Sequence, residues 1–264
     1  MDAFTRFIAS HHSTGGRAFI SNPPGPALLL WSNSNSLPNI TGVSLVKSIN
    51  SSTSIGVPSQ IVSALLKQQL NTQINFLDIE YDPNLNGMVI DGQNYSMSDA
   101  AGYISKTFNV GLGNSNPKRP NNLSMINDPF HLWSRSVFSG TSVMKIDIDL
   151  LMLNQTMNQI TSIVEIKRSA RSPVGIWKPY INPQANNDIN NYFMMMSFAN
   201  CLGVDFHTIH HEEVRTNVAL NPNDNVDIFS YRPSNQQPNQ QILNLFGAEN
   251  NRNQQTVTYV ANML

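Results

Sequence analysis

Two short segments of the chain carry carboxylates and a lysine at spacings that suit metal-assisted hydrolysis. The first contains Asp147 and Asp149, and the second is Glu165-Ile166-Lys167. Side chains alternate between the two faces of a β-strand, so the two aspartates share a face, as do the glutamate and the lysine. Carboxylate oxygens are hard ligands that suit Mg²⁺. A lysine beside such an ion can orient the attacking water or stabilise charge in the transition state.

The elements that must position these residues are predicted from the hydrophobic pattern. Ser142–Leu153 and Gln159–Arg168 are predicted strands, and the turn Asn154–Asn158 joins them into an antiparallel hairpin. A helix over Pro183–Cys201 and a strand over Val204–His210 are predicted to follow. Because adjacent strands lie about 4.8 Å apart, the carboxylates and the lysine can converge on one side of the hairpin.

This pattern resembles the PD-(D/E)xK nuclease superfamily, which includes restriction endonucleases, phage exonucleases and Holliday-junction resolvases. Asp149 followed by two leucines matches the family's acid, and Glu165-Ile166-Lys167 matches its E-x-K element. In that family a helix and a further strand follow the hairpin, in the order expected here over roughly residues 125–211. The resemblance implies an α/β (α+β) fold class: a restriction-endonuclease-like core with a mixed central sheet and flanking helices, plus irregular N- and C-terminal extensions.

The resemblance also implies a function and its residues. It implies a metal-dependent nuclease that hydrolyses phosphodiester bonds in nucleic acid, DNA rather than RNA, with Mg²⁺ or Mn²⁺ as cofactor. Asp149, Glu165 and Lys167 are the expected catalytic residues. Asp149, Glu165 and the Ile166 carbonyl are the expected metal ligands, with Asp147 as a second or alternative aspartate ligand.

The match to the family departs at the upstream acid. Many members add a glutamate on a preceding helix, but no glutamate lies between Tyr81 and Val164. That role is therefore empty, or it falls to Glu80 or Asp128.

Basic residues gather around the predicted hairpin. Eight lysines and arginines but only four acids lie between Lys118 and Lys178, and no acid lies between Glu165 and Asp188. Such a segment can neutralise backbone phosphates. The residues expected to bind nucleic acid are Arg135, Arg168, Arg171 and Lys178.

A histidine cluster offers a weaker alternative. His207, His210 and His211 precede two glutamates and could together suggest zinc. Alternation along a strand, however, separates His207 from His210, so a shared ion is disfavoured. An accessory role for one histidine near the hairpin site is the other interpretation.

Composition excludes several classes of protein. The 264 residues include 35 asparagines, a single cysteine, Cys201, and only 12% charged residues, with a net charge of −1. A disulfide scaffold and a coiled coil are therefore excluded.

No transmembrane span or signal peptide is recognisable, which predicts a cytoplasmic protein (host cytoplasm if viral) with no membrane partner. The near-neutral charge leaves open an alternative function: a non-catalytic nucleic-acid-binding or structural protein, for instance a viral component. A homodimer that makes paired cuts also stays open.

Three regions are expected along the chain. Residues 1–120 form an Asn- and Ser-rich region of helices and short strands, residues 121–211 form the nuclease-like core, and residues 212–264 form a polar extension packed on it. Outside the core, the expected elements are as follows: an irregular start, a helix over Gln60–Leu70, a strand over Ile74–Tyr81, a tight turn at Asp91-Gly92, a helix over Asp99–Phe108 capped by Ser98, strands over Val226–Tyr231 and Thr256–Val260, and a helix over Gln240–Phe246.

Overall fold

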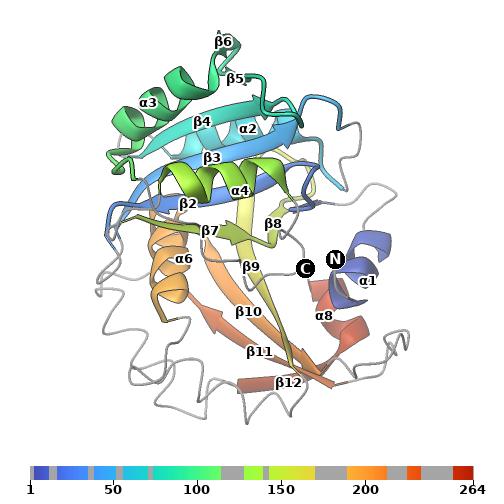
Figure 1. Ribbon diagram of the computed structural model, residues 1–264. Helices are drawn as coiled ribbons and strands as arrows, with labels where there is room; N and C mark the ends of the chain where they lie inside the picture. Colours follow the sequence, from blue (N-terminus) through green and yellow to red (C-terminus); the bar gives the residue numbers. More distant parts are fainter. Residues whose placement is uncertain are drawn as a thin grey trace. The chain divides into compact units, whose positions relative to one another are not determined.

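The described part of the chain folds as a mixed α and β protein with two six-stranded sheets (Figure 1). The computed structural model describes residues 3–11, 17–34, 39–51, 56–70, 74–113, 128–138, 143–169, 189–212, 225–232 and 252–263. Two compact units are distinguished. The N-terminal unit is Ile20–Ile148, and the C-terminal unit is Met1–Phe19 together with Asp149–Leu264.

The sheet of the N-terminal unit has the strand order β6-β5-β4-β3-β2-β7. Strands β3 and β4 are parallel, and the other neighbouring pairs are antiparallel. Its strands are β2 (Ala27–Ser32), β3 (Ile40–Ser48), β4 (Asn75–Tyr81), β5 (Met88–Ile90), β6 (Gln93–Tyr95) and β7 (Met144–Ile148).

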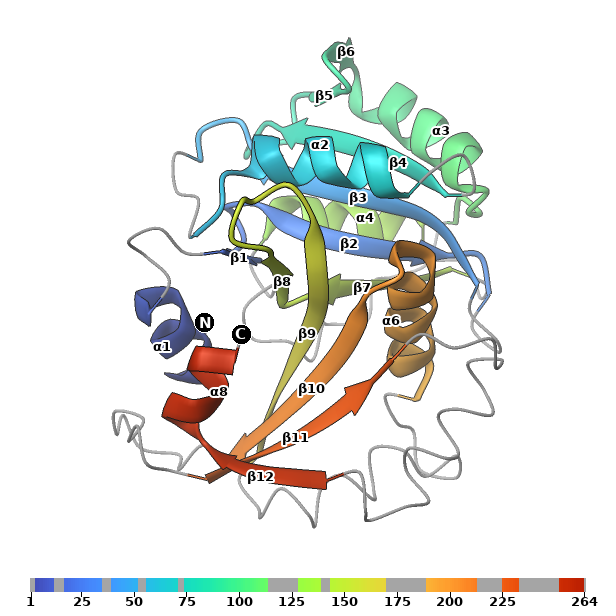
Figure 2. The same ribbon diagram turned by 180° about the vertical axis from the view of Figure 1, so that it is seen from behind.

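Helices cover both faces of this sheet. Helix α2 (Ser59–Gln69) lies on one face, and α3 (Met97–Phe108) and α4 (Pro129–Val137) lie on the other (Figures 1 and 2). Side chains of a strand alternate between the two faces of the sheet, and those of β2 and β3 are almost wholly buried on both faces. Both faces of the sheet are therefore covered by helices. The core under α3 and α4 is rich in aromatic side chains, which are Trp31, Tyr81, Phe108, Phe130 and Phe138.

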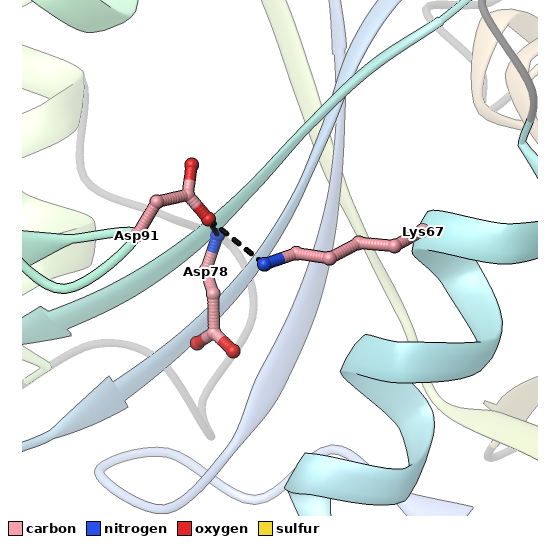
Figure 3. A network of polar contacts seen from close by, with 3 residues as sticks. All are labelled: Lys67, Asp78 and Asp91. Carbon is pink, nitrogen blue, oxygen red and sulfur yellow. Dashed lines mark hydrogen bonds and ion pairs between the residues drawn. The ribbon is translucent and has the colours of Figure 1, made fainter.

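The hairpin turn between β5 and β6 is held to α2 by one carboxylate. Asp91 and Gly92 both have positive φ, 47° and 82°, which confirms the predicted tight turn. Figure 3 shows the Asp91 carboxylate accepting from the Asp78 backbone N–H at 3.3 Å and from the Lys67 ammonium at 3.1 Å. Helix, strand and turn therefore share one polar contact.

Gly42 of β3 allows close packing of α3. A Cβ atom at this position would overlap the ring of Phe108. We expect Gly42→Ala to lower the free energy of unfolding by about 1–3 kcal/mol, because the ring must move within a packed core. Urea denaturation followed by tryptophan fluorescence measures the change.

Gly102 is the matched control for this substitution. It lies in α3, and a Cβ atom there would meet nothing within 4 Å. Gly102→Ala should stabilise the protein by about 0.5–1 kcal/mol, since glycine is a poor helix former. If the two variants were equally stable, the packing explanation of Gly42 would be wrong.

The sheet of the C-terminal unit has the order β1-β8-β9-β10-β11-β12. Strands β9 and β10 are parallel, and α6 (Ile189–Leu202) lies between them in the chain. The pairs β8–β9, β10–β11 and β11–β12 are antiparallel. Its strands are β1 (Ala18–Ile20), β8 (Leu150–Leu153), β9 (Ile160–Ser169), β10 (Asp205–Glu212), β11 (Asn225–Tyr231) and β12 (Arg252–Thr256).

Helices α6 and α1 (Ala3–His11) pack on opposite faces of this second sheet. Tyr192 of α6 contacts the ring of Phe206, whereas Phe4 of α1 stacks on His211 with ring centroids 5.3 Å apart. Phe206 and His211 lie an odd number of residues apart on β10, so their side chains point to opposite faces. Helix α8 (Val257–Met263) lies beside α1 (Figures 1 and 2).

The predicted strand Ser142–Leu153 is interrupted, which corrects the expected hairpin. Asp149 is a bend, β7 before it pairs with β2, and β8 after it pairs with β9. The alternating apolar residues continue through the bend, so the pattern gave no sign that the chain changes sheet. The hairpin is therefore formed by β8 and β9 alone.

The predicted domain boundaries also differ from the compact units. The units meet at Ile148/Asp149, within the region 121–211 that was expected to form one core. Residues beyond 212 supply β11 and β12, which continue the sheet that contains β9 and β10. The C-terminal region is thus part of a sheet and not only an extension packed on one.

Individual residues set the ends of the helices, in part differently from the predictions. Gly203 follows α6 with φ 68°, the left-handed conformation that suits a helix C-terminal cap. The expected irregular start contains helix α1, because Phe4 and Ile8 form a buried i, i+4 pair. The cap of α3 is Ser96 instead of Ser98, since its hydroxyl accepts from the Asp99 N–H.

The C-terminal end differs as well. The predicted strand Thr256–Val260 is largely helix α8, and the Thr256 hydroxyl accepts from the Tyr259 N–H at its start. The predicted helix Gln240–Phe246 lies outside the described residues.

Candidate functional site

Asp149 lies directly before β8 and is hydrogen-bonded to β9, the strand that carries Glu165. Leu150 pairs with Val164 in the antiparallel register, and Asp149 is the bend residue directly before Leu150. Asp149 Oδ2 accepts a 2.6 Å hydrogen bond from the backbone N–H of Ile166. This bond fixes the aspartate beside the strand that carries the glutamate.

The Ile166 backbone faces the same place. The N–H and C=O of a residue in an antiparallel pair point to the same neighbouring strand. Because the Ile166 N–H reaches Asp149, its carbonyl oxygen is on that side of β9 too. The Asp149 carboxylate and the Ile166 carbonyl therefore lie on the same side of β9, next to Glu165 in the sequence.

Glu165 and Lys167 form a largely buried ion pair. Lys167 Nζ lies 2.6 Å from Glu165 Oε1, and the two side chains are 18% and 9% exposed. The ammonium also lies 5.8 Å from the centroid of the Tyr192 ring on α6. Charges this buried are costly unless they are paired with good geometry, and this pair meets that condition.

Lys167 is the first of three polar residues that lie side by side on neighbouring strands. Lys167 is the register partner of His210 on β10, and His210 is the partner of Asp227 on β11. Both added side chains are fully buried. Burial, followed by the charges of Lys167 and His211, lowers the pKa of His210 to about 3, so its imidazole is neutral. Sequence reasoning raised an accessory histidine but missed Asp227, whose place beside His210 follows only from strand pairing.

The three histidines of the expected zinc alternative do not share a face. His207 is on the face opposite His210, where its Nδ1 lies 2.8 Å from the Ser230 hydroxyl. His211 is also on that opposite face, against Phe4. Within the described residues, no three His, Cys, Asp or Glu side chains are grouped so that they could hold a metal ion.

Two carboxylates nevertheless fit Mg²⁺. This ion commonly uses one or two protein carboxylates and keeps several waters, unlike zinc in a closed site. Asp149, Glu165 and the Ile166 carbonyl are all oxygen donors, as Mg²⁺ or Mn²⁺ prefers. The donor set therefore matches the expected ion in chemical type.

Asp147 has a different environment from the one predicted. It lies on β7 opposite Leu29 of β2, in the N-terminal unit. Its charge acts on Lys145: burial lowers the pKa of Lys145 to about 7, and the charges of Asp128 and Asp147 partly oppose that shift. The interruption at Asp149 is the reason that Asp147 and Asp149 do not share a strand face.

The other upstream acids also have partners within the N-terminal unit. Glu80 pairs with Lys47 at 2.7 Å. Asp128 caps α4 by accepting from the His131 N–H at 2.7 Å, and it accepts from the Tyr81 hydroxyl at 2.5 Å. Both acids are therefore engaged in contacts that stabilise the N-terminal unit.

Two of the four predicted phosphate-binding residues lie within the described residues, one in each unit. Arg135 lies on α4 in the N-terminal unit, where burial lowers the pKa of its guanidinium. The backbone of Arg168 lies on β9, opposite that of His211. Arg171 and Lys178 lie outside the described residues.

A pocket of about 390 Å³ lies in the N-terminal unit, and its lining includes none of the predicted catalytic residues. Its lining includes Pro23, Pro83, Asp128 and Pro129. Asp128 is already engaged by Tyr81 and by the start of α4. The carboxylate of Asp128, which lines this pocket, is therefore already engaged in contacts within the protein.

Comparisons with known proteins identify no relative. No protein-family model, curated protein or solved structure matches the chain. In the part of the chain that the structure describes, no helix is long and apolar enough to cross a membrane.

Proposed function

We propose that the C-terminal unit carries a metal-dependent phosphodiesterase site for nucleic acid, with DNA as the substrate. The observation that carries this proposal is that Asp149 accepts from the backbone N–H of Ile166, the residue that lies between the ion-paired Glu165 and Lys167. Carboxylates can hold a divalent ion, and a lysine beside them can act on the reacting groups.

The order of elements supports the same reaction. The acid precedes β8, the E-x-K sequence lies in β9, α6 follows, and β10 returns parallel to β9. This order agrees with the nuclease pattern that the sequence resembles. The choice of DNA over RNA rests on that resemblance.

The roles of the residues follow from their positions. Asp149, Glu165 and the Ile166 carbonyl would hold Mg²⁺ or Mn²⁺. When bound, such an ion lowers the pKa of a coordinated water and neutralises charge on a phosphoryl oxygen. Lys167 would orient the attacking water and stabilise negative charge on the phosphate, since its ammonium lies beside Glu165.

The direct experiment is a cleavage assay on single-stranded, double-stranded and branched DNA, and on RNA. Each substrate is incubated with Mg²⁺, with Mn²⁺ and with EDTA. The proposal predicts cleavage of at least one DNA substrate that needs the metal and stops with EDTA. Metal-independent binding without cleavage of any substrate would instead support the alternative, a non-catalytic nucleic-acid-binding protein.

The basic residues Arg168, Arg171 and Lys178 give a separate prediction. Replacing Arg168, Arg171 or Lys178 with alanine should weaken binding to all sequences about equally. Each change should reduce the slope of log K against log salt by about one, because one phosphate contact is lost. Fluorescence anisotropy over a salt series measures the slope, and Lys67→Ala, on α2 of the N-terminal unit, is the control. Unchanged slopes in all three variants would exclude these residues from the interface.

A further inference from the structure

The row Lys167–His210–Asp227 extends the proposed site, and the inference drawn from it rests on the proposed function. The three residues are successive register partners on β9, β10 and β11. Directly paired residues have their side chains on the same face, with Cβ atoms about 4.5–5.5 Å apart. Their shared face is the one covered by α6, because Tyr192 contacts both Lys167 and Phe206, and Tyr231 of β11 donates to Asn200 of α6.

Burial distinguishes the two ends of this row. Lys167 is 18% exposed, whereas His210 and Asp227 are fully buried behind it. A buried carboxylate is retained where charged or hydrogen-bonding groups compensate it. In this row His210 is adjacent to Asp227, and the cation of Lys167 lies one strand further.

A metal ion bound to Glu165 would weaken the ion pair between Glu165 and Lys167, so a second anion would be needed to hold the lysine. Its ammonium is held by Glu165 at 2.6 Å. If Glu165 serves a divalent ion, much of its charge is committed to that ion, and a nearby lysine is repelled by the same ion. A carboxylate on the other side of the lysine would hold the ammonium in place.

We propose that Asp227, acting through His210, is the second anchor that positions Lys167 when Glu165 holds the metal. Strands β9 and β11 are about 9–10 Å apart across β10, so the side chain of His210 lies between those of Lys167 and Asp227. A neutral imidazole can accept a hydrogen bond at one nitrogen and donate from the other, so it can link a cation to a carboxylate. His210 and Asp227 are thus positioning residues and are not in contact with the phosphate.

The test compares variants of both positioning residues on the DNA substrate that the wild type cuts. Asp227→Asn and His210→Leu should each lower kcat about 10–100-fold, the range found for outer partners of a metal site, with KM within about twofold of wild type. His210→Gln should recover most of the lost rate, because an amide can also accept and donate. Mn²⁺ affinity, measured by calorimetry, should stay within about twofold in all three variants.

His211→Leu is the matched control. His211 is the next residue on β10 and is equally buried, but it faces Phe4 on the opposite side of the sheet. This change should lower thermal stability without changing kcat. Thermal unfolding of every variant separates a loss of folded protein from a loss of rate.

The outcomes distinguish this inference from the proposed function. A wild type that cuts no substrate removes the proposed function and the inference with it. A wild type that cuts, with Asp227→Asn and His210→Leu equal to it in kcat, removes the inference alone. Loss of Mn²⁺ binding in parallel with kcat, or no recovery in His210→Gln, would also overturn it, because it would assign the row a purely structural role.

Discussion

Lys167→Ala should reduce the rate of DNA cleavage about 10²–10³-fold, the usual effect of removing one electrostatic donor from a transition state. The ammonium lies beside Glu165 and over the ring of Tyr192, at the position proposed for the transition-state contact. Mn²⁺ affinity should not fall, because a cation near the ion has been removed. Lys167→Arg keeps the charge and should retain part of the rate.

The same change has a structural cost that must be measured separately. Glu165 is only 9% exposed, and removing the lysine deprives it of a cation at 2.6 Å. We therefore expect a lower melting temperature for Lys167→Ala, although the protein should still fold. Lys47→Ala is the matched control, because Lys47 forms a similar strand-face pair with Glu80 at 2.7 Å in the N-terminal unit. Wild-type cleavage by Lys167→Ala would end the catalytic assignment of this lysine.

Glu165→Gln should behave differently, because both cleavage and metal binding should fall. The amide keeps the shape of the side chain but replaces a charged ligand with a neutral one. We expect Mn²⁺ affinity to drop at least about 10-fold and cleavage to fall at least as far. Calorimetry with Mn²⁺ and the DNA cleavage assay give the two readouts.

The control for this substitution is Glu80→Gln, which breaks an ion pair of similar length away from the hairpin. It should leave both Mn²⁺ affinity and cleavage unchanged. Undiminished Mn²⁺ binding in Glu165→Gln would mean that the glutamate serves Lys167 alone. The pair would then be a structural contact of β9.

The sequence contained enough information to place Glu165 and Lys167, because a strand with alternating apolar residues fixes which side chains share a face. The order of β8, β9, α6 and β10 also follows from local patterns of hydrophobic residues and from the turn at Asn154–Asn158. These features are local, so they can be predicted from a few neighbouring residues.

What could not be predicted depends on pairing between distant segments. The chain passes from one sheet to the other at Asp149, while the alternation of Ile146, Ile148 and Leu150 continues unchanged. The shared face expected for Asp147 and Asp149 was wrong for that reason. Asp227 likewise gave no local signal, since only the β10–β11 register sets it beside His210.

The most direct measurement of the central claim is a crystal structure of the full chain soaked in Mn²⁺, with anomalous diffraction data to locate the ion. The account predicts a peak bound by carboxylate oxygens of both Asp149 and Glu165, roughly 2.0–2.3 Å from each. The Ile166 carbonyl should be the third protein ligand, and Lys167 should have moved off Glu165 toward His210. A peak elsewhere, or none at this hairpin with Lys167 still paired to Glu165, would contradict the account.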